Sequence, residues 1–140
     1  MDKTIKVGDF VSVNNTVTES NIIKFSDISG DFNPIHLDEE YAKDSIFKKR
    51  IAHGFLVGSY ISAVIGQKLP GNGTIYLSQS LYFRAPVFIN DQITTTVEVL
   101  DFPKPNRVLL KTICVNQEGK IVLEGEAIVI PPVGTILIKD

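Results

Sequence analysis

The residue types best suited to chemistry lie in segment 31–36, where a carboxylate, Asp31, and an imidazole, His36, are five residues apart. Pro34 disfavours helical geometry at Asn33, so the segment is predicted to be a loop. A carboxylate and an imidazole on one loop can hold a water molecule between them. The carboxylate would act as general base, and the imidazole would orient the water or donate a proton. The same pattern is also a common turn signature, because Asp and Asn side chains bond to nearby backbone.

The dipeptide His53-Gly54 directly precedes the most apolar segment of the chain, residues 55–67. Backbone N–H groups at the start of a helix have no intrahelical partner and carry the positive end of the helix dipole. Glycine lets a ligand approach the backbone closely. The Gly54 N–H could therefore polarise a carbonyl and stabilise a developing enolate oxygen. The alternative is that Gly54 only allows a tight entry into the helix, and His53 is interpreted as structural.

The remaining candidates have simpler interpretations. The run Lys48-Lys49-Arg50 is interpreted as a charged surface turn rather than a phosphate site, and Arg84, at a strand end, stays ambiguous. Ser59 and Ser62 lie outside a Gly-x-Ser-x-Gly setting, so packing of small residues explains them better than nucleophilic chemistry. Cys114, in a β-rich run, is predicted to be a core residue.

Composition excludes several classes of function. The 140 residues suggest one domain over 1–140, and 14 Lys+Arg against 16 Asp+Glu give a net charge of −2, which argues against nucleic acid as a partner. One cysteine and two histidines make a Cys/His zinc site unexpected and fit a reducing compartment. The N-terminus lacks the apolar region of a signal peptide, and the longest apolar stretch is too short to span a bilayer. We expect a cytoplasmic protein with no metal and no membrane partner.

The elements that must position these residues differ between the two halves of the chain. In the first half, residues 10–13 can form a strand, Thr18 can cap a helix that Gly30 ends, and Asp38 can cap a short helix through Ala42. Residues 55–67 are apolar on every side, which predicts a buried helix.

The second half alternates apolar and polar residues over 75–84, 93–99 and 122–130, with a further β-rich run at 108–115. This period of two is typical of half-buried strands, and the turn signals at 90–91 and 117–120 predict antiparallel hairpins. The sheet must cover its apolar face, and only helix 55–67 is apolar enough. The patterns therefore predict an α+β protein with the hot-dog fold, an antiparallel sheet wrapped around one central helix.

Several segments together carry a resemblance to a known family. Segment 29–36, Ser-Gly-Asp-Phe-Asn-Pro-Ile-His, is followed after five residues by Ala42, and His53-Gly54-Phe55 and segments 69–76 and 83–87 continue the pattern. This order resembles the (R)-specific enoyl-CoA hydratases, also called MaoC-like hydratases or hydratase 2, of the short bacterial type with one hot-dog domain. The resemblance covers roughly residues 7–129, and only the tail after Pro132 has no counterpart.

The resemblance implies a homodimer whose two sheets join edge to edge, and reversible hydration of trans-2-enoyl-CoA to (R)-3-hydroxyacyl-CoA. Asp31 and His36 would be the catalytic dyad, and the Gly54 N–H would be the oxyanion hole for the thioester carbonyl. Asn33 would support the loop, and two helix residues, Ser62 and Ile65, would line the acyl pocket. Such a reaction needs no metal or redox cofactor, and CoA is here the carrier of the substrate.

Three alternatives stay open on the sequence. A hot-dog thioesterase would hydrolyse the thioester, but that reaction does not need the Asp-x-Asn-Pro-x-His pattern. A dehydratase acting on acyl-carrier protein would use the same chemistry on a different carrier. A non-catalytic binding module of the same fold is disfavoured by the intact pair of Asp31 and His36.

Overall fold

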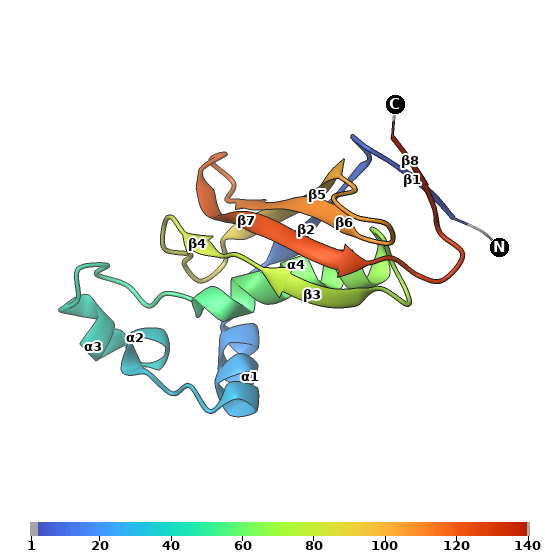
Figure 1. Cartoon of the computed structure of the whole chain (residues 1–140). Helices are drawn as coiled ribbons and strands as arrows, with labels where there is room; N and C mark the ends of the chain where they lie inside the picture. Colours follow the sequence, from blue (N-terminus) through green and yellow to red (C-terminus); the bar gives the residue numbers. More distant parts are fainter. Residues whose placement is uncertain (1–2, 140) are drawn as a thin grey trace.

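The computed structural model describes residues 3–139 and contains four helices and eight strands within that range (Figure 1). The helices are α1 (Glu19–Ser29), α2 (Pro34–Leu37), α3 (Glu39–Lys43) and α4 (Gly54–Gln67). The strands are β1 (Thr4–Lys6), β2 (Phe10–Thr16), β3 (Ile75–Gln79), β4 (Tyr82–Phe83), β5 (Gln92–Asp101), β6 (Val108–Val115), β7 (Ile121–Ile130) and β8 (Ile136–Ile138). No helix among residues 3–139 is both long enough and apolar enough to cross a membrane.

One antiparallel sheet covers the long helix. Its strands run in the order β2-β5-β6-β7-β3, and β4 pairs with β7. Helix α4 lies along one face of this sheet and contacts β2, β5 and β6 (Figure 1). The core between them is built from fully buried aliphatic side chains, among them Ile61, Val64, Ile65, Ile93, Val97, Val99 and Leu110. The predicted hot-dog fold is therefore confirmed, as is the hairpin at 117–120, which joins β6 to β7. The hairpin predicted at 90–91 is wrong, because β4 pairs with β7 whereas β5 pairs with β2 and β6.

The predicted strand 75–84 is wrong in two respects. It breaks into β3 and β4 at Ser80, because the Ser80 main chain lies directly over Gly125 of β7, where a Cβ would come within 1.8 Å of the Ser80 carbonyl oxygen. Strand β3 is also not half-buried, since Ile75, Tyr76 and Leu77 are all exposed. As the last strand of the sheet, β3 has one edge without a neighbouring strand among residues 3–139.

The two ends of the described chain pair with each other, which the sequence analysis did not predict. Strand β1 pairs in parallel with β8, and Ile5 of β1 is fully buried. The Lys3 ammonium donates to the carbonyls of Lys68 and Pro70, just beyond the C-terminal end of α4. The tail after Pro132 thus contributes a strand.

Helices α1, α2 and α3 lie together beside the N-terminal end of α4 (Figure 1). The ends of α1 and the start of α3 are those that the sequence predicted: Thr18 Oγ1 accepts from the Asn21 N–H, Gly30 ends α1 with a positive φ of 78°, and Asp38 caps α3. The prediction that all of segment 31–36 is a loop is wrong, because Asn33 caps a short helix that begins at Pro34. The loop between α1 and α2 carries Asp31, and α2 carries His36.

Candidate active site

The loop from Asp31 to α2 is shaped by two successive side-chain turns. Asp31 Oδ1 accepts from the Asn33 N–H over 3.1 Å, and Asn33 Oδ1 accepts from the Ile35 N–H over 3.2 Å. Asn33 is therefore the N-cap of α2, and Pro34 occupies the first helical position, where it needs no N–H. The turn interpretation is correct, and it also leaves the second carboxylate oxygen of Asp31 without a hydrogen-bond partner among residues 3–139.

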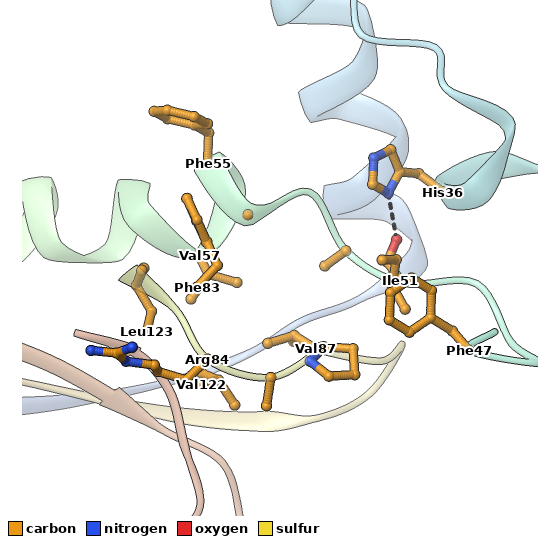
Figure 2. Close-up of a pocket in the computed structure, with 14 residues that line it drawn as sticks. His36, Phe47, Ile51, Phe55, Val57, Phe83, Arg84, Val87, Val122 and Leu123 are labelled. Carbon is orange, nitrogen blue, oxygen red and sulfur yellow. Dashed lines mark hydrogen bonds between the residues drawn. The ribbon is translucent and has the colours of Figure 1, made fainter. Parts of the chain in front are cut away.

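His36 has a defined tautomer. Its Nδ1 lies 2.7 Å from the carbonyl oxygen of Ile51, as the dashed line in Figure 2 shows. A carbonyl only accepts, so Nδ1 carries the proton and Nε2 remains for other chemistry. The Ile51 N–H in turn donates to the Ile35 carbonyl over 3.2 Å. Segments 35–36 and 51 are thereby joined by bonds in both directions.

The prediction of a charged surface turn at 48–50 is wrong for Arg50. Lys48 and Lys49 are exposed, whereas Arg50 is only 7% exposed. Its Nε–H donates to the His36 carbonyl over 2.8 Å, and a guanidinium nitrogen pairs with the Glu19 carboxylate of α1 over 2.6 Å. A guanidinium tolerates burial when its charge is paired and its donors are hydrogen-bonded. Arg50 thus connects α1 to the main chain at His36.

His53 is buried beside both members of the predicted dyad. Its Nε2 lies 3.0 Å from Ser26 Oγ and 3.2 Å from the main-chain oxygen of Asp31. Its ring stacks on the His36 ring, with centroids 3.9 Å apart and an interplanar angle of 28°. Burial lowers the pKa of His53 below its ordinary value, and this outweighs the opposing effect of the hydrogen bond to the Asp31 carbonyl. Burial thus favours the neutral form of His53.

Asp31, His36 and His53 are also the one cluster among residues 3–139 whose side chains could hold a metal ion, with donor atoms within 4.8 Å of one another. Each imidazole already uses one nitrogen in a hydrogen bond to a main-chain carbonyl. Because the rings are stacked, their remaining lone pairs lie in nearly parallel planes instead of converging on one point. The arrangement suits proton transfer better than metal binding.

A pocket of about 460 Å³ opens beside His36 and the first turn of α4 (Figure 2). Apart from His36 and Arg84, its lining is uncharged and almost wholly apolar, and comes from three segments: Phe47, Ile51, Ala52, Gly54, Phe55 and Val57; Phe83, Ala85, Pro86 and Val87; Val122 and Leu123. The pocket can therefore hold an apolar group against the His36 ring and the start of the helix.

Gly54 has a free main-chain donor at this pocket. The His53 carbonyl accepts from the N–H groups of Leu56 and Val57, and the Gly54 N–H has no acceptor among residues 3–139. A Cβ at Gly54 would lie 2.5 Å from the Phe83 ring, so glycine is required for this close contact between α4 and β4. The free N–H and His36 thus border one cavity.

Ser62 and Ile65 do not line this pocket. Ser62 is exposed on α4, and Ile65 is buried in the core that α4 forms with the sheet. Two residues with clear positions at the site gave no signal in the sequence: Phe47 lies beside a charged run, and Ile51 acts through its main chain. Cys114 is buried, as predicted, and Arg84 borders the pocket, paired with Glu124 over 2.9 Å.

Comparison with known proteins shows which family the chain belongs to. Residues 7–122 match the family model described as MaoC like domain. The chain is 48% identical over 129 residues to an (R)-specific enoyl-CoA hydratase of Rhodospirillum rubrum, covering 91% of this chain and 89% of the relative.

Two solved structures are also similar. An (R)-hydratase from Aeromonas caviae involved in PHA biosynthesis has a TM-score of 0.89 and 38% identity, covering 91% of this chain and 98% of that one. The R-hydratase PhaJ1 from Pseudomonas aeruginosa, in the unliganded form, has a TM-score of 0.88 and 44% identity, with 91% and 83% covered. The family model matches well over half of the chain, and on that ground this protein belongs to the MaoC-like domain family.

Proposed function

We propose that this protein catalyses the reversible addition of water to trans-2-enoyl-CoA thioesters, giving (R)-3-hydroxyacyl-CoA. The observation that carries the proposal is that an oriented imidazole and a free helix N–H border one apolar pocket, with the Asp31 carboxylate within 4.8 Å of that imidazole. Relatives named for this reaction support it over most of the chain.

The proposed roles follow from what hydration requires. A water molecule held between the free Asp31 oxygen and His36 Nε2 gives up a proton to the carboxylate as its oxygen bonds to C3. The electron pair of the double bond moves toward the thioester oxygen, where the Gly54 N–H stabilises the developing negative charge. The dyad then delivers a proton to C2, so the elements of one water molecule are added. Asn33 holds Asp31 in place through the turns described above.

The acyl chain is proposed to extend along α4 toward Ser62 and Ile65. At a rise of 1.5 Å per residue, these positions lie about 12 and 16.5 Å along the helix from Gly54, beyond the reach of a four-carbon chain. Substitutions at Ser62 or Ile65 are therefore expected to alter turnover of long enoyl-CoAs and to leave the four-carbon substrate unaffected.

The test is hydration of enoyl-CoAs from four to twelve carbons, with chiral analysis of the product. The proposal predicts loss of enoyl absorbance and an (R)-3-hydroxyacyl product. Release of free thiol without hydration would identify a thioesterase. Hydration of enoyl thioesters of acyl-carrier protein but not of CoA would identify acyl-carrier protein as the carrier. No reaction with any of these substrates would point to a binding module.

A homodimer is part of the proposal, supported by strand β3. Its outer edge has no partner strand in the described part of the chain, and Ile75, Tyr76 and Leu77 of this strand are exposed. An open apolar strand edge favours pairing with another chain. Light scattering should give twice the chain mass of 15.5 kDa, and Leu77→Lys should shift the mass toward the monomer. Ile46→Lys, at an 88% exposed position away from the sheet, is the control that should leave the mass unchanged.

A cytoplasmic location is the last part of the proposal. It is supported by Cys114, a free and buried thiol.

A further inference from the structure

His53 connects every part of the site that the proposed function uses. Through Nε2 it contacts Ser26 of α1 and the main chain of Asp31, through its ring face it contacts His36 of α2, and as the N-cap of α4 it directly precedes Gly54. It is 2% exposed and lies outside the lining of the pocket. It therefore has a role other than contact with a ligand in that pocket.

The hydrogen bonds determine the protonation state of His53. The Asp31 main-chain oxygen can only accept, so the proton of His53 is on Nε2. Its Nδ1 is buried and has no hydrogen-bond partner among residues 3–139. A second proton on Nδ1 would place a buried charge without an acceptor, with the His36 ring 3.9 Å away.

The surroundings of His53 agree with a neutral ring. From α1 it meets the Phe25 ring, with centroids 4.8 Å apart, and the Ser26 hydroxyl. The titratable groups close to it are His36 and Asp31, and Asp31 presents its main-chain oxygen to Nε2. The hydrogen bond between the Asp31 loop and His53 is therefore donated by the N–H of a neutral ring.

From this geometry we infer that His53 is a positioning residue for the hydration reaction: its neutral Nε2–H form holds the main chain of Asp31, and its ring fixes the plane of His36. This inference rests on the proposed function. Without the Nε2–H bond, the loop from Gly30 to Asn33 depends on its own turns alone. Without the His53 ring, the His36 ring loses the stacking contact on one of its faces.

Two substitutions separate these contributions. His53→Gln keeps an amide N–H near the position of Nε2, and His53→Phe keeps an aromatic face but removes the donor. Misplacement of a catalytic group by about 1 Å costs up to about a hundredfold in rate. We expect His53→Phe to lower kcat for crotonyl-CoA about ten- to a hundredfold with KM changed less than about threefold. His53→Gln should recover part of this loss, because it restores the donor but not the ring face.

Ser26→Ala is the matched control, because it removes the other partner of Nε2 and leaves the bond to Asp31 intact. Its kcat should stay within about threefold of the wild type. A folded His53→Phe protein that keeps more than half of the wild-type kcat would overturn the inference. So would a His53→Gln protein as impaired as His53→Phe.

A second measurement needs no variant. The ¹⁵N spectrum of the wild-type histidines should show His53 neutral at pH 7, protonated on Nε2, with a slowly exchanging proton. A charged His53, or one protonated on Nδ1, would contradict the inference even if the His53 variants failed to fold. Failure of the wild type to hydrate any enoyl-CoA would refute the proposed function, while this spectrum would still decide the state of His53.

Discussion

The Nδ1–H of His36 donates to the main-chain carbonyl of Ile51 over 2.7 Å. Since a carbonyl cannot donate, this bond decides which nitrogen of His36 can act on a water molecule. The bond exists because Arg50 and Ile51 lie against α2, with the Ile51 N–H bonded to the Ile35 carbonyl and Arg50 Nε bonded to that of His36. These main-chain hydrogen bonds thus determine the tautomer and the orientation of the His36 imidazole.

Removing either member of the dyad should nearly abolish hydration. Asp31→Asn and His36→Ala are each expected to lower kcat for crotonyl-CoA by about a hundredfold or more, the usual size of a general acid–base contribution. Asp38→Asn is the control, because Asn also caps a helix and Asp38 caps α3 away from the pocket. If either dyad variant retained more than half of the wild-type rate, the assignment of Asp31 and His36 would be wrong.

Replacing Arg50 should affect both stability and rate. Arg50→Met removes the bond to the His36 carbonyl and the pair with Glu19, so we expect a loss of about 1–3 kcal/mol in the free energy of unfolding and a lower kcat. Lys49→Met, an exposed neighbour, should change the free energy by less than about 0.5 kcal/mol. Urea unfolding and steady-state kinetics on both proteins measure the effects. Equal stability of the two variants would show that the buried guanidinium is not needed.

Gly54 needs a test that accounts for Phe83. A Cβ at position 54 would lie 2.5 Å from the Phe83 ring, so Gly54→Ala or Gly54→Val must displace that ring as well as crowd the free N–H. We expect Gly54→Val to lower kcat/KM by about 10²–10³ in a protein that is folded by circular dichroism.

The double variant Gly54→Ala/Phe83→Ala separates the two effects. Phe83→Ala removes the clash and leaves the main chain at Gly54 unchanged. If the double variant matched Phe83→Ala alone in rate, displacement of the ring would explain the loss in Gly54→Ala. A double variant that remains impaired would support crowding of the N–H itself.

The stability of the protein should fall in mild acid because of His53. Unfolded His53 takes up a proton near its ordinary pKa of 6.5, whereas burial lowers its pKa in the folded state. Below pH 6.5 the unfolded state therefore binds more protons, and acidification lowers the free energy of unfolding by up to about 1.4 kcal/mol per pH unit from this group, until the folded pKa is reached. His53→Gln should reduce this dependence. Urea unfolding at pH 7.5, 6.5 and 5.5 would measure it, and parallel curves for the two proteins would contradict the prediction.

Cys114 should be unreactive in the folded protein. Burial raises the pKa of its thiol to about 11, and the Thr95 hydroxyl is 3.3 Å from its sulfur. A thiol of that pKa forms almost no thiolate at pH 8, so a thiol reagent should modify Cys114 only after denaturation. Rapid modification at pH 8 without denaturant would show that the core opens around β6.

The sequence by itself determined most of the local structure. Thr18 and Gly30 mark the ends of α1, Asp38 caps α3, and the all-round apolar pattern of 55–67 identifies α4, because caps and hydrophobic periodicity act over one or two helical turns. The alternation over β5 and β7 predicted the antiparallel sheet for the same reason. Asp31, His36 and Gly54 stood out because a carboxylate and an imidazole are five residues apart in one short segment and a glycine directly precedes the most apolar segment.

Only the tertiary structure decided how these residues meet. The burial of Arg50 depends on Glu19, 31 positions earlier, and the tautomer of His36 depends on a carbonyl 15 positions later. Strand 75–84 breaks where Ser80 crosses Gly125, and β8 forms only because β1 lies beside it. Every residue has a main-chain carbonyl, so the sequence does not indicate that the carbonyls of Ile51 and Asp31 accept hydrogen bonds from His36 and His53. These bonds become visible only when folding places distant segments within hydrogen-bond distance of each other.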